Sequence, residues 1–273
     1  MPPSGREVRW RRVWVLLDRR RMDQQFLILT IAVVVASALQ SATGIGFGVI
    51  AGPVMLIVLN SGAAIQISIA LSLLIAVVLV PSLWRNMDRQ LLVRFLAGSL
   101  VGLPVGLVIF LSIEIDLLKL LAGLAVLFTL VFVLRAKAAT PLAGGGGGGK
   151  LEQLSMGGIS GAMSGSLAMP GPIPAAWMLA RGYDKTTVRA TILAMFIFSY
   201  PAALALQASL VGVSSETVWQ SMILAPPSLV GVYIGRWLAA LLTERIFQWA
   251  LISVLATTTI FLFFSSIPNL VPR

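Results

Sequence analysis

The sequence predicts an all-α polytopic integral membrane protein made of two inverted repeats, each a broken, re-entrant helical hairpin followed by three transmembrane helices. Three observations predict this fold class. Hydrophobic residues make up 58% of the chain and charged residues 11%, and the mean hydropathy is +0.95, outside the usual range of soluble domains. Several apolar stretches reach the roughly 20 residues that a helix needs to cross a bilayer. Two glycine-containing motifs each occur twice, once in each half of the chain.

The expected membrane segments recur along the whole chain with no soluble domain between them, so a cleaved signal peptide cannot account for them. In chain order they are 26–43, 49–59, 63–83, 92–111, 117–134, 154–169, 172–180, 190–210, 218–242 and 246–264. The first two together span 34 positions, or ~51 Å of helix, which is too short for two passes of a ~30 Å core. We therefore expect a hairpin that turns back at mid-depth, and a matching hairpin with a half-length second arm at 172–180.

The repeated motifs define the domain organisation. One pair of stretches, "GSLVGLPVGL" and "PSLVGVYIGR", shares a Ser-Leu-Val-Gly run. A second pair consists of "SATGIGFGVIAGPVML" in the first half and the similar stretch "GAMSGSLAMPGPIPAAW" in the second half. Pro172 and Pro174 suit the first turn of a new helix. The expected parts are a basic N-terminal segment (1–25), the first repeat (26–135), a flexible Gly-rich linker (136–152), the second repeat (153–265) and a short tail (266–273).

Loop charges support the inverted arrangement, which an odd number of crossings per repeat requires. Loops 84–94, 135–150 and 181–189 are basic, whereas loops 112–116 and 211–217 contain acidic residues and no base. By the positive-inside rule the first hairpin enters a bacterial inner membrane from outside.

The N-terminal tail does not fit this orientation, because seven of the twenty basic residues fall within the first 21 positions. We expect it either to contact anionic lipid headgroups or to precede a physiological start at Met22. A nucleic-acid partner is not expected.

Composition argues against catalysis. The chain contains no cysteine and no histidine, so thiolate nucleophiles, histidine bases and the usual metal ligands are missing, and neither a metal nor a cofactor is expected. All ten carboxylates lie in the tail, in loops or at span ends, which leaves no candidate for a buried proton relay. The chain is therefore not expected to be an enzyme.

The helix breaks are the candidate anion sites. Free N–H groups at the start of a half-helix attract anions, and glycine lets a ligand approach the backbone. Gly44, Gly46 and Gly48 could serve this purpose or equally permit close packing. Packing is the favoured role for a second group of glycines, Gly98, Gly102, Gly106, Gly231 and Gly235.

Polar side chains cluster near both breaks and could donate hydrogen bonds without a fixed charge. They are Gln40, Ser41 and Thr43 in the first half and Ser160, Ser164 and Ser166 in the second, with Gln66, Ser68, Tyr200 and Gln207 in the following spans. For each of them an interhelical packing hydrogen bond is the favoured role. Arg189 and Arg236 could balance the charge of an anion, although snorkelling to the headgroups is the favoured alternative.

From about Met22 onward the chain resembles the sulfite exporter TauE/SafE family of membrane permeases. Gly44, Gly46, Gly48 and Pro53 match the family's glycine-dense motif, and Gly165, Gly171 and Pro174 correspond in the second half. Phe47 interrupts the first glycine run and "SLAMPGP" replaces most of the second, where a substrate would touch the backbone. The resemblance implies transport of small anions such as sulfite, sulfonates or related organosulfur acids, or of similar carboxylates.

The sequence thus predicts a secondary transporter with its substrate site between two hairpin tips, which is exposed to each side in turn as the halves rock. The predicted substrate-binding residues are Gln40, Ser41, Thr43, Gly44, Gly46, Gly48, Ser164, Gly165, Ser166, Gly171, Arg189 and Arg236. Coupling to sodium, or to no ion, is favoured over a carboxylate proton relay. A membrane scaffold that recruits partners through the basic tail is the alternative from another class.

Overall fold

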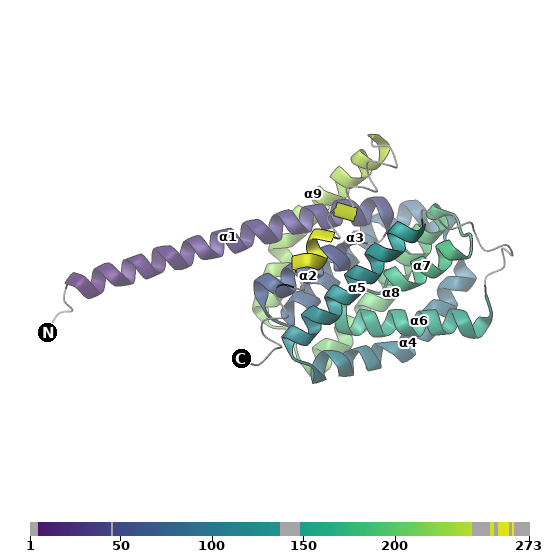
Figure 1. Cartoon of the computed structure of the whole chain (residues 1–273), viewed down its shortest axis with the longest axis horizontal. Helices are drawn as coiled ribbons and strands as arrows, with labels where there is room; N and C mark the ends of the chain where they lie inside the picture. Colours follow the sequence, from purple (N-terminus) through teal and green to yellow (C-terminus); the bar gives the residue numbers. More distant parts are fainter. Residues whose placement is uncertain are drawn as a thin grey trace.

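The computed structural model describes residues 5–44, 46–136 and 148–241, with 252–253, 256–261 and 264 near the C-terminus, and these residues form helices without strands (Figure 1). The helices are α1 (Gly5–Thr43), α2 (Phe47–Leu59), α3 (Ala63–Leu83), the 3-10 turn η1 (Trp84–Asn86), α4 (Arg89–Ser112), α5 (Ile115–Ala136), α6 (Lys150–Leu167), α7 (Pro172–Ala180), α8 (Lys185–Leu210) and α9 (Ser215–Leu241). The predicted all-α polytopic class is confirmed. The expected span at 246–264 and the linker and tail lie largely outside the described residues.

Five helices of the described chain are long and apolar enough to cross a membrane. They are the Gln24–Thr43 part of α1, α3 with η1, α4, α8 and the Ser215–Leu238 part of α9. Each consists of 20 to 26 residues, or ~30 to ~40 Å of helix. Aspartate side chains cap the N-termini of α4 and α8. Asp88 accepts a hydrogen bond from the Leu91 amide, and Asp184 accepts from the amides of Thr186 and Thr187.

The first hairpin is longer than the sequence predicted. α1 is one continuous helix of 39 residues, and its N-terminal part projects away from the bundle (Figure 1). Its apolar part, Gln24–Thr43, is long enough to cross a bilayer alone, whereas α2 has 13 residues and reaches only ~20 Å. α1 ends at Thr43, where the sequence placed the end of the first apolar stretch, and the chain breaks at Gly44 as expected; the turn at mid-depth stays a prediction. The second hairpin is also unequal, with 18 residues in α6 and 9 in α7.

Reciprocal glycines join α4 to α6. A Cβ atom added to any of them would lie 1.9 to 2.7 Å from a carbonyl oxygen of the facing helix, so the two backbones are in direct contact. These glycines are Gly98, Gly102 and Gly106 on α4 and Gly157, Gly161 and Gly165 on α6. The contact is the small-residue packing of membrane helices. The packing role predicted for the three α4 glycines is confirmed.

The same contact recurs between α9 and α1. A Cβ atom on Gly231 or Gly235 would lie 2.4 or 2.2 Å from a carbonyl oxygen of α1. α4 of the first half therefore packs on the first hairpin arm of the second half, and α9 of the second half packs on the first hairpin arm of the first half. This exchange follows the internal repeat seen in the sequence.

The equivalent helices α3 and α8 lie side by side and antiparallel. Gln66, near the start of α3, donates a 3.0 Å hydrogen bond to the Gly212 carbonyl just after α8, and the amide of Asp88 donates to the Thr191 hydroxyl near the start of α8 at 3.0 Å. Antiparallel equivalent helices are what inverted repeats predict. The inverted repeat itself stays a prediction.

Candidate functional site

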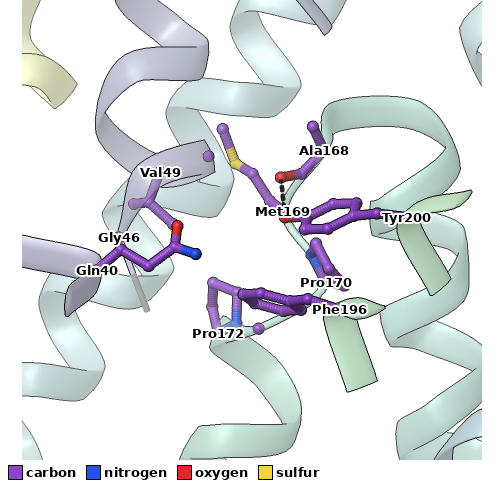
Figure 2. Close-up of a pocket in the computed structure, with 11 residues that line it drawn as sticks. Gln40, Gly46, Val49, Ala168, Met169, Pro170, Pro172, Phe196 and Tyr200 are labelled. Atoms are coloured by element: carbon purple, nitrogen blue, oxygen red, sulfur yellow. Dashed lines mark hydrogen bonds between the residues drawn. The ribbon is translucent and has the colours of Figure 1, made fainter. Parts of the chain in front are cut away.

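Two helix breaks come together inside the bundle. One lies between α1 and α2, where Gly44 and Gly46 adopt φ angles of 81° and 144°, and the other lies between α6 and α7, where Ala168 adopts 57°. Gly48, at the start of α2, packs so closely on the second break that an added Cβ would lie 2.1 Å from the Ala168 carbonyl oxygen. The sequence motifs that form the two tips are thus in direct contact, and Figure 2 shows residues of both breaks around one space.

Side chains fix the backbone of the second break. The carbonyl of Ala168 accepts a 3.1 Å hydrogen bond from the hydroxyl of Tyr200, which is 1% exposed on α8. The carbonyl of Pro170 accepts a 2.6 Å bond from the Ser160 hydroxyl, and the Met169 amide donates to the Met163 carbonyl at 3.2 Å. Backbone groups that leave a helix at membrane depth need such partners, because hydrocarbon supplies none.

A small recess lies between the two breaks, beside the contact of Gly48 with Ala168. Its lining combines both breaks with one face of α8: Gln40, Gly46, Gly48, Val49, Ala168, Met169, Pro170, Gly171, Pro172, Phe196 and Tyr200. The volume of ~10 Å³ has room for about one water molecule. The Gln40 amide points toward this space in Figure 2 and lies 3.4 Å from the Ser72 carbonyl, to which it donates. A multi-atom oxyanion therefore requires the tips to move apart.

The two half-helices begin with different numbers of N–H groups that have no partner inside the helix. The first three residues of α2, Phe47 to Val49, carry N–H groups with no partner inside the helix, since the first intrahelical bond runs from the Ile50 amide to the Gly46 carbonyl. In α7 two of the first three residues are proline, which leaves only the N–H of Ile173. The donor set is therefore concentrated on α2.

Arg189 lies against the first break rather than extending along the helix toward headgroups. Its guanidinium Nη2 donates to the Ser41 carbonyl at the end of α1, and its side-chain stem covers Gly44, where an added Cβ would lie 2.7 Å from Cγ of Arg189. The side chain is half-buried, while Arg236 on α9 is exposed. Neither arginine lines the recess.

The hydroxyls predicted for the site form packing contacts. Ser41 donates to the Val232 carbonyl of α9 at 3.0 Å, whereas Thr43 and Ser166 donate to carbonyls of their own helices at 2.8 Å. Gly165 packs on α4 and accepts a 2.8 Å hydrogen bond from the Gln207 amide. Ser164 is fully buried, and its hydroxyl has no hydrogen-bond partner.

Of the twelve predicted residues, the structure brings Gln40, Gly46, Gly48 and Gly171 to the recess and places Gly44 with Arg189 beside it. Sequence reasoning named Tyr200 only as a further candidate and missed Phe196, whose ring centroid lies 4.9 Å from that of Tyr200. The spacing of four residues on one helix face was the signal available for this pair.

A second, larger cavity of ~260 Å³ lies between α3, α8 and α9 near the loop after α8. Its lining is mainly apolar, with Gln66, Thr217 and Ser221 as the polar members. It contains no charged residue and no helix break, so it lacks the features of the recess.

The helices and the two apposed breaks define a multi-pass membrane protein of the transporter class. The chain belongs to the sulfite exporter TauE/SafE family, whose family model matches residues 29–262. Comparison with curated proteins and with solved structures gives no match. A small-molecule substrate and a membrane environment follow from this family.

Proposed function

We propose that this chain is a secondary transporter of a bacterial inner membrane that moves small anions, namely sulfite, sulfonates or related organosulfur acids. The substrate site lies in the recess between the two helix breaks. The observation that carries this proposal is the contact between the α1–α2 tip and the α6–α7 tip, which brings backbone N–H groups and the Gln40 amide to one enclosed point. Membership of the sulfite exporter family supports the choice of anion.

The chemistry of the recess suits a weakly held oxyanion. The start of α2 supplies up to three N–H groups and the positive end of the helix dipole, and Gln40 supplies a neutral amide. Tyr200 adds a hydroxyl that now donates to the Ala168 carbonyl. Hydrogen bonds from uncharged groups hold an anion without the strong retention that a buried cation would cause.

The size of the recess supports a mechanism by alternating exposure. At ~10 Å³ the space between the tips is closed to sulfite, so the tips must separate toward one side for the anion to bind. Export from a negative interior needs no second ion, because a potential of ~100 mV is worth ~2.3 kcal/mol per charge. Sodium coupling through backbone carbonyls is a further proposal that the same experiment can test.

Charge movement in proteoliposomes tests the proposal. Jumps in sulfite, in a series of sulfonates and in small carboxylates should give saturating currents for the organosulfur class. Gly46→Leu should abolish them, because Gly46 has a φ of 144° and caps α2. Gly149→Ala is the matched control, since no atom lies within 4 Å of the added Cβ. Saturating currents with carboxylates alone would assign the site to that class, and silence with folded protein would refute the transport of these anions.

The projecting N-terminal part of α1 favours one alternative function, a scaffold that recruits partners through its basic residues (Figure 1). Deletion of residues 1–21 separates the two functions. A permease keeps its current after the deletion, whereas a scaffold loses its partners.

A further inference from the structure

Two arginines from different helices converge on the end of α1. Arg189 of α8 donates through Nη2 to the carbonyl of Ser41, and the hydroxyl of the same serine donates to the carbonyl of Val232 on α9 at 3.0 Å. Arg236 follows Val232 by four residues and therefore lies one turn further along the same side of α9. Its neighbour Gly235 packs on the α1 backbone at Ala38, which holds this part of α9 against α1.

The positive charge of this pair is not neutralised within the described part of the chain. The ion pairs found there join Lys119 to Asp116 and Arg181 to Glu152, so neither arginine of the pair shares a carboxylate. Nε of Arg189 is buried and has no hydrogen-bond partner. A half-buried guanidinium group without a carboxylate is costly unless an anion compensates its charge, and the turn of α9 that carries Arg236 packs on the same end of α1.

The position of the pair connects the surface with the first helix break. Arg236 is exposed, whereas Arg189 is half-buried and lies on Gly44, whose lack of a side chain admits the arginine stem. The loop that precedes α8 is one of the basic loops predicted to face the cytoplasm. Both arginines are absent from the lining of the recess, so they form a separate location.

We propose that Arg189 and Arg236 form a second oxyanion site at the cytoplasmic end of the first break. Its ligand is a sulfite or sulfonate group, or the phosphate of an anionic lipid, because guanidinium groups bind such oxygens in pairs. In the first case the site receives the anion before it reaches the recess, and this part of the proposal rests on the proposed transport function. Arg189 would then contact both the bound anion and, through its hydrogen bond to the Ser41 carbonyl, the first break.

Ligand-induced stabilisation tests the site independently of transport. The unfolding temperature of the purified full chain is measured in sodium sulfite and in sodium chloride at equal ionic strength. Sulfite should stabilise the wild type, and the half-saturating sulfite concentration should be about tenfold higher in Arg236→Gln and in Arg189→Gln. Arg85→Gln, an exposed arginine of η1, is the matched control. Arg189→Lys keeps the charge in case the glutamine variant fails to fold.

A second arm separates the two sources of the oxyanion. The same proteins are placed in nanodiscs of phosphatidylglycerol or of phosphatidylcholine. If a lipid phosphate fills the site, phosphatidylglycerol stabilises the wild type but not Arg236→Gln, and sulfite adds little. If the free anion fills it, sulfite stabilises the wild type equally in both lipids.

The proposal is overturned if neither sulfite nor phosphatidylglycerol stabilises the wild type, or if both stabilise Arg236→Gln and Arg189→Lys as they do the wild type. Failure of the transport function looks different. In that case the sulfite shift still depends on the two arginines, while no anion gives a current in the wild type. Normal currents in all arginine variants, together with sulfite and phosphatidylglycerol shifts that match those of the wild type, would refute the site and leave the transport function in place.

Discussion

Substitution of Gly48 by alanine tests the contact between the two tips. The added Cβ would lie 2.1 Å from the carbonyl oxygen and 3.1 Å from the carbonyl carbon of Ala168. No flexible side chain can move out of the way, because the obstructing atoms belong to the backbone, so the tips must separate by about 1 Å to restore an ordinary contact. Overpacking of this kind costs roughly 1–3 kcal/mol, and the ~1 kcal/mol that alanine gains over glycine in a helix offsets only part of it.

The matched control is Gly52→Ala, one turn further along α2. Its Cβ would meet the nearest atom, the terminal methyl carbon of Met169, at 3.6 Å, which is an ordinary contact. We expect Gly52→Ala to be as stable as the wild type or slightly more stable, and Gly48→Ala to lower the unfolding temperature and the anion current. Thermal unfolding in detergent and currents in proteoliposomes measure the two quantities.

The reasoning would be refuted if Gly48→Ala matched Gly52→Ala in both measurements. A stable Gly48→Ala protein with normal current would mean that the tips do not touch in the transporting molecule. A destabilised protein with normal current would retain the contact and exclude it from transport.

Three further predictions address other contacts. Tyr200→Phe should cost ~1 kcal/mol of unfolding free energy and change the half-saturating anion concentration, because the carbonyl of the second break loses its 3.1 Å donor; equal stability and equal currents would contradict it. Gly102→Ala should disrupt the α4–α6 contact, with Cβ 1.9 Å from a carbonyl oxygen, whereas Gly158→Ala on the facing helix meets nothing closer than 3.7 Å and should be tolerated in thermal unfolding. Hydrogen bonds from Thr187 and Thr186 at the start of α8 hold the pKa of Asp184 below its usual value. The carboxylate therefore stabilises the fold above the unfolded pKa, and this contribution is lost as pH falls through the lower folded pKa. Asp184→Ala should cost ~1 kcal/mol of unfolding free energy at neutral pH and weaken the dependence of that free energy on acid pH.

The element order could be predicted because it depends on local properties of the sequence. Lengths of apolar stretches, the repeated motifs and the prolines after the second break located the helices to within a few residues. The N-terminal extent of α1 could not be predicted, because hydropathy marks only the apolar part of a helix: the apolar stretch begins at residue 26, whereas the helix begins at Gly5.

The site was predictable in its backbone and less so in its side chains. The glycines and prolines mark where the chain breaks, and the breaks meet as expected. Which side of each helix faces the recess depends on packing between distant segments, so Ser41 turns to α9 while Phe196 lines the cavity. The prolines of α7 were correctly placed at its first turn. Because proline has no N–H group, the start of α7 offers fewer hydrogen-bond donors to an anion than the start of α2 does.

The exchanged glycine contacts have a consequence for how the molecule moves. Since α4 and α6 touch backbone to backbone, as do α1 and α9, we expect each pair to move as one rigid body assembled from both halves of the chain. In the proposed mechanism, the parts that move apart are these two composite bodies, each of which contains one hairpin tip, rather than the two sequence repeats. The antiparallel α3–α8 pair lies between the two bodies, and we expect the rotation to take place there. Cross-links within one body should leave transport intact, whereas cross-links between the bodies should stop it.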